Sequence, residues 1–199
     1  MNRITQITRK AQIARKTKET DISLTLNLDG SGTSNINTGI GFLDHMLSLF
    51  AFHGNFDLDL TCIGDLEVDS HHSIEDIAIC LGKAVNTALA DKIGIQRYAY
   101  NYLPMDETLC RTVIDISGRA YCVYKAEFRR SQLGNLSSED IREFFIAFSN
   151  HSNITIHSEI LYGENDHHKA ESLFKSLGRA LSEAVKISGE KLMSTKGSL

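Results

Sequence analysis

A nineteen-residue stretch that occurs twice constrains this chain more than any other feature. The first copy, HHSIEDIAICLGKAVNTAL, spans residues 71–89, and the second, HHKAESLFKSLGRALSEAV, spans residues 167–185. At a constant offset of 96, seven of the nineteen positions are identical: two His, one Glu, one Leu, one Gly and two Ala. Apolar residues recur at helical spacing behind each His pair. The repeat predicts an internally duplicated protein whose halves each contain an amphipathic helix that begins with His-His-x-x-Glu.

Composition limits the class of protein further. The 199 residues are 42% hydrophobic and 23% charged with a net charge of -4, which is typical of a globular domain and gives no indication of nucleic-acid or membrane partners. No apolar run approaches the roughly 20 residues of a spanning helix. The basic N-terminus lacks the apolar core of a secretory signal, and Ile4, Ile7 and Ile13 alternate with polar neighbours. We therefore expect a cytoplasmic protein that begins with an exposed edge strand or extension.

The order of predicted elements is the same in both halves. Alternating polarity and helical spacing in the first half predict a strand at 22–30, a hairpin partner at 34–40, a helix at 41–54, a strand at 56–64 and the repeat helix from 71 to about 91.

The second half is predicted to contain strands at 106–117 and 120–128, a helix at 137–152, a strand at 154–163 and the repeat helix from 167 to about 187. Ser137 or Ser138 precedes acidic residues, as in a capping box. We expect an α+β fold of duplicated ββαβα halves, each a sheet covered by helices. Residues 1–199 then form a single domain of two pseudo-repeats, about 18–95 and 104–190. The polar tail 189–199 is either disordered or a binding segment.

The spacing of the repeated histidines indicates metal binding. On a helix, Glu75 lies over both His71 and His72, but the two adjacent rings point about 100° apart. One compact ion cannot easily take both rings, whereas two ions can each take one. Imidazole and carboxylate ligands without thiolate suit Mn, Fe, Zn, Co or Ni. His53 and His151 lack this paired context and are expected to be helix-end or core residues.

Several motifs resemble one known family. They are RKTKET at 15–20, GFLDHML at 41–47, GDLEVDSHHSIED at 64–76, PMDE at 104–107, DISGR at 115–119, YGENDHHKAESLFK at 162–175 and STKG at 194–197. In this combination and order the chain resembles the imidazoleglycerol-phosphate dehydratase family of histidine biosynthesis.

The resemblance implies a metal-dependent hydro-lyase that converts D-erythro-imidazoleglycerol phosphate to imidazoleacetol phosphate. It also implies a dinuclear site that binds the substrate imidazole as imidazolate and holds two Mn²⁺ per subunit, although other divalent transition metals can serve. Active sites would lie between subunits of a homo-oligomer of 24 chains. Carried over residue by residue, the implied metal ligands are His45, His71, His72, Glu75, His157, His167, His168 and Glu171.

The same resemblance implies roles for other side chains. Glu19, within RKTKET, would be the catalytic base. The substrate phosphate would be bound by Arg97, Arg119, Lys175, Ser194 and Lys196. The chain departs from the family after DHML, where Ser48 and Leu49 replace the usual polar residue or Gln; this puts one accessory substrate contact in doubt.

Two other classes of protein fit the repeated histidines alone. A dinuclear metallohydrolase would act through a metal-bound hydroxide and would not need Glu19. A metal-stabilised storage or structural assembly would need none of the predicted phosphate ligands. Substitutions at Glu19 and at the cationic residues distinguish these alternatives from the dehydratase.

Overall fold

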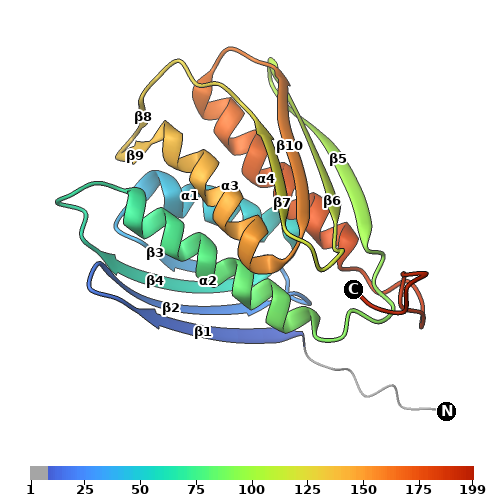
Figure 1. Cartoon of the computed structure of the whole chain (residues 1–199). Helices are drawn as coiled ribbons and strands as arrows, with labels where there is room; N and C mark the ends of the chain where they lie inside the picture. Colours follow the sequence, from blue (N-terminus) through green and yellow to red (C-terminus); the bar gives the residue numbers. More distant parts are fainter. Residues whose placement is uncertain (1–8) are drawn as a thin grey trace.

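The computed structural model describes residues 9–199, in which two four-stranded sheets enclose four helices (Figure 1). The expected positions Ile4 and Ile7 lie outside the described residues. The first sheet has the order β1 (Lys10–Lys16), β2 (Thr20–Asn27), β4 (Asp57–Gly64), β3 (Ser34–Asn37). The second has the order β5 (Tyr98–Met105), β6 (Thr108–Asp115), β10 (Thr155–Tyr162), β7 (Tyr121–Lys125). In each sheet two antiparallel pairings are followed by one parallel pairing, so the predicted duplication is confirmed at the level of topology.

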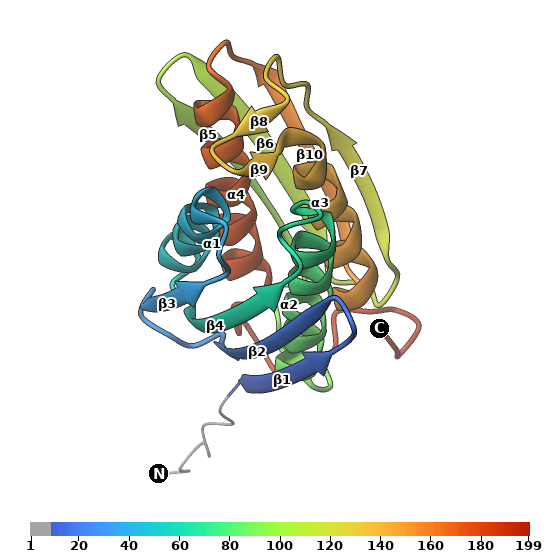
Figure 2. The ribbon, with the colours of Figure 1, turned by 90° about the vertical axis from the view of Figure 1, so that its left-hand side faces the viewer.

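The helices form the two inner layers of the molecule. They are α1 (Gly41–Gly54), α2 (His71–Leu89), α3 (Ser138–Ser152) and α4 (Asp166–Ala184). α1 and α2 cover the first sheet, α3 and α4 cover the second, and the layers meet where α1 packs on α4 and α2 on α3 (Figure 2). A short hairpin, β8 (Gln132–Leu133) and β9 (Leu136–Ser137), precedes α3. The α+β prediction is therefore confirmed.

Residue pattern explains this layering. Buried and exposed side chains alternate along β2, which is expected of a sheet with one face on the core. Both repeat helices bury an apolar stripe and also a glycine, Gly82 in α2 and Gly178 in α4. A Cβ at Gly178 would lie 2.4 Å from the carbonyl oxygen of Phe50, and one at Gly82 would lie 2.8 Å from that of Phe148. The repeated glycine thus allows close helix contact in both halves.

The strand pairing corrects two details of the prediction. Segment 34–40 was expected to be a hairpin partner of 22–30, but β3 pairs in parallel with β4 instead. The reason is that α1 carries the chain across the sheet between β3 and β4, as a βαβ crossover requires. The second half also begins with one more strand than expected. β1 is the exposed edge strand expected near Ile13, whereas β5 was not predicted.

Helix ends also differ from the prediction. α2 ends at Leu89 and α4 at Ala184, before the predicted ends near 91 and 187. The capping box at α3 is wrong, because the Ser137 side chain makes no cap hydrogen bond and the Ser138 hydroxyl donates to the Ser131 carbonyl. None of the helices within residues 9–199 is both long and apolar enough to cross a membrane.

Candidate active site

Three predicted metal ligands converge where α1 packs on α4. Nε2 of His45, on α1, lies 2.9 Å from Oε1 of Glu171, and Nε2 of His167 lies 2.8 Å from the same oxygen. His167 and Glu171 are separated by one turn of α4, so both face α1. Within residues 9–199 this is the one group of three metal-type side chains whose ligand atoms all lie within 4.8 Å of one another.

The charge state of Glu171 suits a cation. Burial alone would raise its pKa, but hydrogen bonds from Lys175, His45 and His167 outweigh burial and lower the pKa to about 2. Lys175 Nζ lies 2.5 Å from Glu171 Oε2. An ionised carboxylate beside two imidazoles is a donor set that divalent transition metals prefer. The residues present therefore fit a metal ion.

The adjacent histidines of the first repeat diverge as predicted. The rings of His71 and His72 are 6.2 Å apart between centroids and inclined at 78°. His71 Nδ1 lies 3.3 Å from Asp140 Oδ1, whereas His72 Nδ1 lies 3.0 Å from Asp65 Oδ2. The hydrogen bond to Asp65 is the largest cause that raises the pKa of His72. Each ring is thus oriented by its own carboxylate, which leaves Nε2 available to a metal.

The second repeat shows the same divergence. The rings of His167 and His168 are 6.4 Å apart and inclined at 88°. His167 joins the cluster with Glu171, whereas His168 Nδ1 lies 2.7 Å from Glu107 Oε2. The two histidines of each pair therefore point to different places.

Five predicted ligands lie outside the cluster: His71, His72 and His168, described above, and also Glu75 and His157. Glu75 is exposed on α2, and His157 is exposed on β10. His157 lies on the outer face of the second sheet, in a shallow cavity of about 350 Å³ that Tyr100 and Val113 also line. α4 covers the opposite face of this sheet, so His157 cannot reach His167 within one chain.

Glu19, the predicted base, lies beside a predicted metal ligand. It is in the turn between β1 and β2, and its Oε1 is 3.9 Å from His72 Nε2. The Glu19 side chain is 52% exposed. The structure thus brings a solvent-accessible carboxylate to the first repeat's His pair.

The predicted phosphate ligands fall into two groups. Lys175 is held by Glu171 in the middle of α4. Arg97 is beyond the end of α4, where its Nε donates to Asp115 Oδ1 at 2.7 Å and its Nη1 to the Met193 carbonyl. A single chain therefore does not assemble all of the predicted phosphate ligands at one point.

The tail joins the second group. Arg119 is exposed in the turn after Gly118, and a Cβ on Gly118 would lie 2.5 Å from the carbonyl carbon of Leu199. Ser194 and Lys196 follow Met193 in this tail, which has no regular secondary structure. The tail therefore contacts Arg97 and lies beside the turn that contains Arg119.

Ser48 and Leu49, where the sequence departs from the family pattern, both make contacts within the fold. The Ser48 hydroxyl donates to the Asp44 carbonyl at 2.8 Å, and Leu49 packs against the core. Both side chains are thus used within the fold. The control histidines, His53 and His151, lie in the last turns of α1 and α3, as predicted.

Sequence reasoning missed the carboxylates that orient the histidines: Asp65, Glu107 and Asp140. Asp65 and Glu107 lie within two motifs that carry the family resemblance, GDLEVDSHH and PMDE, so the resemblance was the one available signal for them. Asp140 lies on α3, 69 residues from His71, and spacing gives no sign of this contact.

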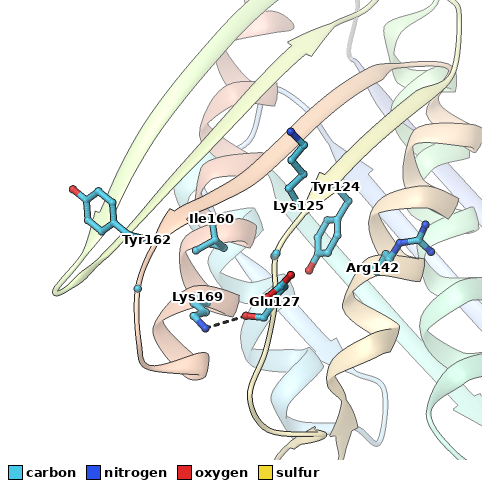
Figure 3. A pocket seen from close by; sticks show the side chains of 9 residues that line it. Tyr124, Lys125, Glu127, Arg142, Ile160, Tyr162 and Lys169 are labelled. Atoms are coloured by element: carbon cyan, nitrogen blue, oxygen red, sulfur yellow. Dashed lines mark hydrogen bonds between the residues drawn. The ribbon is translucent and has the colours of Figure 1, made fainter.

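A separate cavity lies between β7, α3 and the start of α4 (Figure 3). Its volume is about 630 Å³, and its lining includes Tyr124, Arg142 and Lys169. Lys169 is buried but neutralised by Asp166 at 3.0 Å, and it donates to the Glu127 carbonyl at 2.9 Å. This cavity contains none of the predicted site residues.

Fold and site together define a duplicated α+β protein with a histidine–carboxylate metal centre as its candidate site. The family model described as imidazoleglycerol-phosphate dehydratase matches residues 38–181. The imidazoleglycerol-phosphate dehydratase of Chlorobaculum parvum is 54% identical over 191 residues, which are 96% of this chain and 98% of that protein. The enzyme of the same name from Clostridium novyi is 56% identical over 194 residues, with 96% and 98% of the two chains covered.

Solved structures agree. Imidazoleglycerol-phosphate dehydratase from Staphylococcus aureus has a TM-score of 0.82 at 37% identity and covers 90% of this chain and 99% of its own. The Pyrococcus furiosus structure has a TM-score of 0.80 at 35% identity and covers 94% and 100%. The chain therefore belongs to the imidazoleglycerol-phosphate dehydratase family, whose members are lyases of histidine biosynthesis.

Proposed function

We propose that this protein is a metal-dependent hydro-lyase that dehydrates imidazoleglycerol phosphate to imidazoleacetol phosphate. Beyond family membership, one observation carries the proposal: Glu171 is an ionised, buried carboxylate held between His45 and His167. A carboxylate with two imidazoles on one oxygen is arranged for a cation rather than for a structural ion pair.

Two divalent ions per subunit, normally Mn²⁺, would be held by the two His-His-x-x-Glu helix starts together with His45 and His157. When bound, the metals would supply Lewis acidity to the nitrogen atoms of the substrate imidazole. The chain's own part is to fix each ligand ring. Asp140, Asp65 and Glu107 accept from the Nδ1 atoms of their histidines and so set the tautomer that presents Nε2.

Glu19 would remove the carbon-bound proton. The C–H bond to be broken is not flanked by a carbonyl, so the substrate's own imidazole ring must serve as the electron sink. The imidazolate would first expel the hydroxyl on the adjacent carbon, and the ring would then take back the C–H electron pair as Glu19 removes the proton. Glu19 Oε1 lies 3.9 Å from His72 Nε2 and is open to solvent, so a substrate bound next to His72 lies within its reach. The resulting enol then tautomerises to the ketone.

Cationic side chains would bind the phosphate. Lys175 lies one turn beyond Glu171 and donates to it, so the same helix face offers a ligand for the metal and a cation for the phosphate. Arg97 is oriented by Asp115, and the tail with Ser194 and Lys196 passes beside it. Closure of this tail over the phosphate would exclude water from the reacting centre.

The divergence of the ligands supports sites shared between subunits. His157 is on the outer face of the second sheet and Glu75 is exposed on α2, whereas the His45 cluster lies between α1 and α4. A second copy of the chain that places its own exposed ligands against this cluster completes the set. We therefore propose a homo-oligomer of 24 chains with active sites at its interfaces.

Turnover tests the proposal directly. Purified protein loaded with Mn²⁺ is mixed with imidazoleglycerol phosphate, and the ketone product is followed by its enolate absorbance in alkali. The proposal predicts product formation that chelation abolishes and added Mn²⁺ restores. Release of inorganic phosphate without ketone would indicate a hydrolase instead, and metal binding without any turnover would indicate a storage or structural protein.

A further inference from the structure

The internal duplication places a Glu-Thr pair at the same point of both halves. Residues 17–19 join β1 and β2, and Lys18 and Glu19 are the two central residues of the turn, since Thr17 N donates to Thr20 O at 2.9 Å across it. β5 and β6 are joined by Asp106 and Glu107, where Met105 pairs with Thr108. Glu19 and Glu107 are therefore equivalent residues of two-residue turns, and each precedes a threonine.

Both carboxylate oxygens of Glu107, in the second half, are hydrogen-bonded. Glu107 Oε1 accepts from the backbone N–H of Asn165 at 2.7 Å, from that of Glu164 at 3.1 Å and from the Thr108 hydroxyl at 3.0 Å. Its other oxygen is bonded to His168. The hydrogen bond from Asn165, followed by that with His168, holds the pKa of Glu107 well below its usual range. Such a carboxylate is a fixed structural acceptor.

The carboxylate of Glu19, in the first half, is not held by hydrogen bonds in this way. Among residues 9–199, none donates a hydrogen bond to the Glu19 carboxylate. The Thr20 hydroxyl, whose counterpart in Thr108 bonds the preceding glutamate, donates instead to Asp76 Oδ2 at 2.5 Å. Asp76 Oδ1 accepts from Arg15 Nε at 2.9 Å. The Thr20 hydroxyl is thus hydrogen-bonded to Asp76 and does not donate to the Glu19 carboxylate.

Asp76 is specific to the half that contains the free acid. It is 5% exposed and lies one turn after His72, on the face of α2 that packs on β1 and β2. At the repeat offset of 96 its counterpart is Ser172, whose hydroxyl donates to the Lys169 carbonyl at 2.8 Å. The second half therefore has a serine, and not a carboxylate, at the position equivalent to Asp76.

The backbone of Glu19 is fixed on both sides. Its N–H donates to the Thr17 hydroxyl at 3.0 Å, and its carbonyl accepts from the N–H of Asp65 at 3.1 Å. The turn thus fixes the backbone of Glu19, whereas its side chain is 52% exposed.

We propose that Asp76 is a positioning residue for the reaction: by binding Thr20 and Arg15 it fixes the turn and keeps the Glu19 carboxylate unbonded next to His72. This inference rests on the proposed role of Glu19 as the base. The two equivalent turns would then have different roles: Glu107 is a hydrogen-bonded structural residue in the second half, and Glu19 is the base in the first.

Isosteric variants of Thr20 test the proposal with little risk to folding. Thr20→Val removes the hydroxyl that Asp76 accepts, whereas Thr20→Ser keeps it. In the Mn²⁺-loaded assembly, we expect Thr20→Val and Asp76→Asn each to lower kcat by about 10- to 100-fold, as a misplaced catalytic group does, with KM and metal content near wild type. Thr20→Ser, which keeps the hydroxyl, should retain most of the wild-type kcat. Asp21→Asn, at an exposed carboxylate that pairs with Lys16, is the matched control and should keep wild-type kcat.

Glu19→Gln is measured alongside and separates the two proposals. If Glu19→Gln is inactive while Thr20→Val and Asp76→Asn keep wild-type kcat, the positioning role of Asp76 is overturned and the base remains. A fall in kcat that only matches a loss of bound metal or of folded protein also overturns it. If Glu19→Gln keeps wild-type kcat, the proposed base itself is wrong.

Discussion

His45 Nε2 and Glu171 Oε1 lie 2.9 Å apart, although 126 residues separate them in the chain. The contact exists because α1 and α4 approach closely, and they do so at Gly178, where any Cβ would lie 2.4 Å from the Phe50 carbonyl oxygen. The glycine that the two repeats share thus serves helix packing, and the packing brings together ligands from the two halves. The candidate metal centre is a product of the duplication.

Gly178→Ala should damage both packing and metal binding. The new methyl group would collide with backbone atoms of α1, and overpacking of this kind costs about 1–3 kcal/mol. Urea unfolding of the metal-free protein measures the loss. Gly41→Ala is the matched control, because nothing lies within 4 Å of a Cβ at Gly41. Equal unfolding midpoints for the two variants would contradict the packing argument.

Glu171→Gln should weaken metal binding by about 100-fold or more, since loss of a partner outside the ligand shell already costs 10–100-fold. The amide keeps the shape of the side chain but loses the charge that two imidazoles and Lys175 surround. Isothermal titration with Mn²⁺ gives the affinity. His53→Ala, in the last turn of the same α1 helix that contains His45, is the control and should bind as wild type. Unchanged affinity in Glu171→Gln would exclude this carboxylate as a ligand.

Asp166→Asn should destabilise the fold by about 3 kcal/mol, because it leaves the buried Lys169 ammonium unpaired. The side chains of Asp166 and Lys169 are 2% and 7% exposed. In contrast, Lys186→Ala removes an ion pair with Glu183 whose members are 66% and 56% exposed, and it should change stability by less than about 1 kcal/mol. Both values come from denaturant unfolding, and a similar effect of the two substitutions would argue against the buried pair.

Chelation should break the assembly into smaller oligomers. The exposed ligands His157 and Glu75 do not reach the His45 cluster within one chain, so metal would join subunits. Sizing chromatography before and after treatment with EDTA shows the change, and added Mn²⁺ should reverse it. A particle that keeps its size after complete metal removal would show that the ligands are not shared.

Sequence patterns predicted most of the fold because the repeat helices and alternating strands are strongly periodic. β5 was missed, since Tyr98, Tyr100 and Tyr102 occupy its exposed face and mask the usual alternation of polar and apolar residues. The pairing of β3 was wrong because strand pairing is decided by the crossover through α1, which periodicity does not reveal.

In the candidate site too, the features that follow from helix periodicity could be predicted, and those that depend on tertiary packing could not. The helix period placed His167 and Glu171 on one face, and the divergence of His71 from His72 followed from 100° per residue. The contact of His45 with Glu171 and that of His71 with Asp140 depend on tertiary packing. Glu19, in a turn, had no periodicity to mark it and was identified only by resemblance.

The most direct test of the account is the turnover number of Glu19→Gln in the Mn²⁺-loaded assembly, with metal content and particle size verified against wild type. If Glu19 removes the carbon-bound proton, kcat for ketone formation from imidazoleglycerol phosphate should fall by about 10²–10⁴-fold, the usual contribution of a general base. Substrate affinity should change little. A variant with wild-type metal content, wild-type assembly and wild-type kcat would contradict the account.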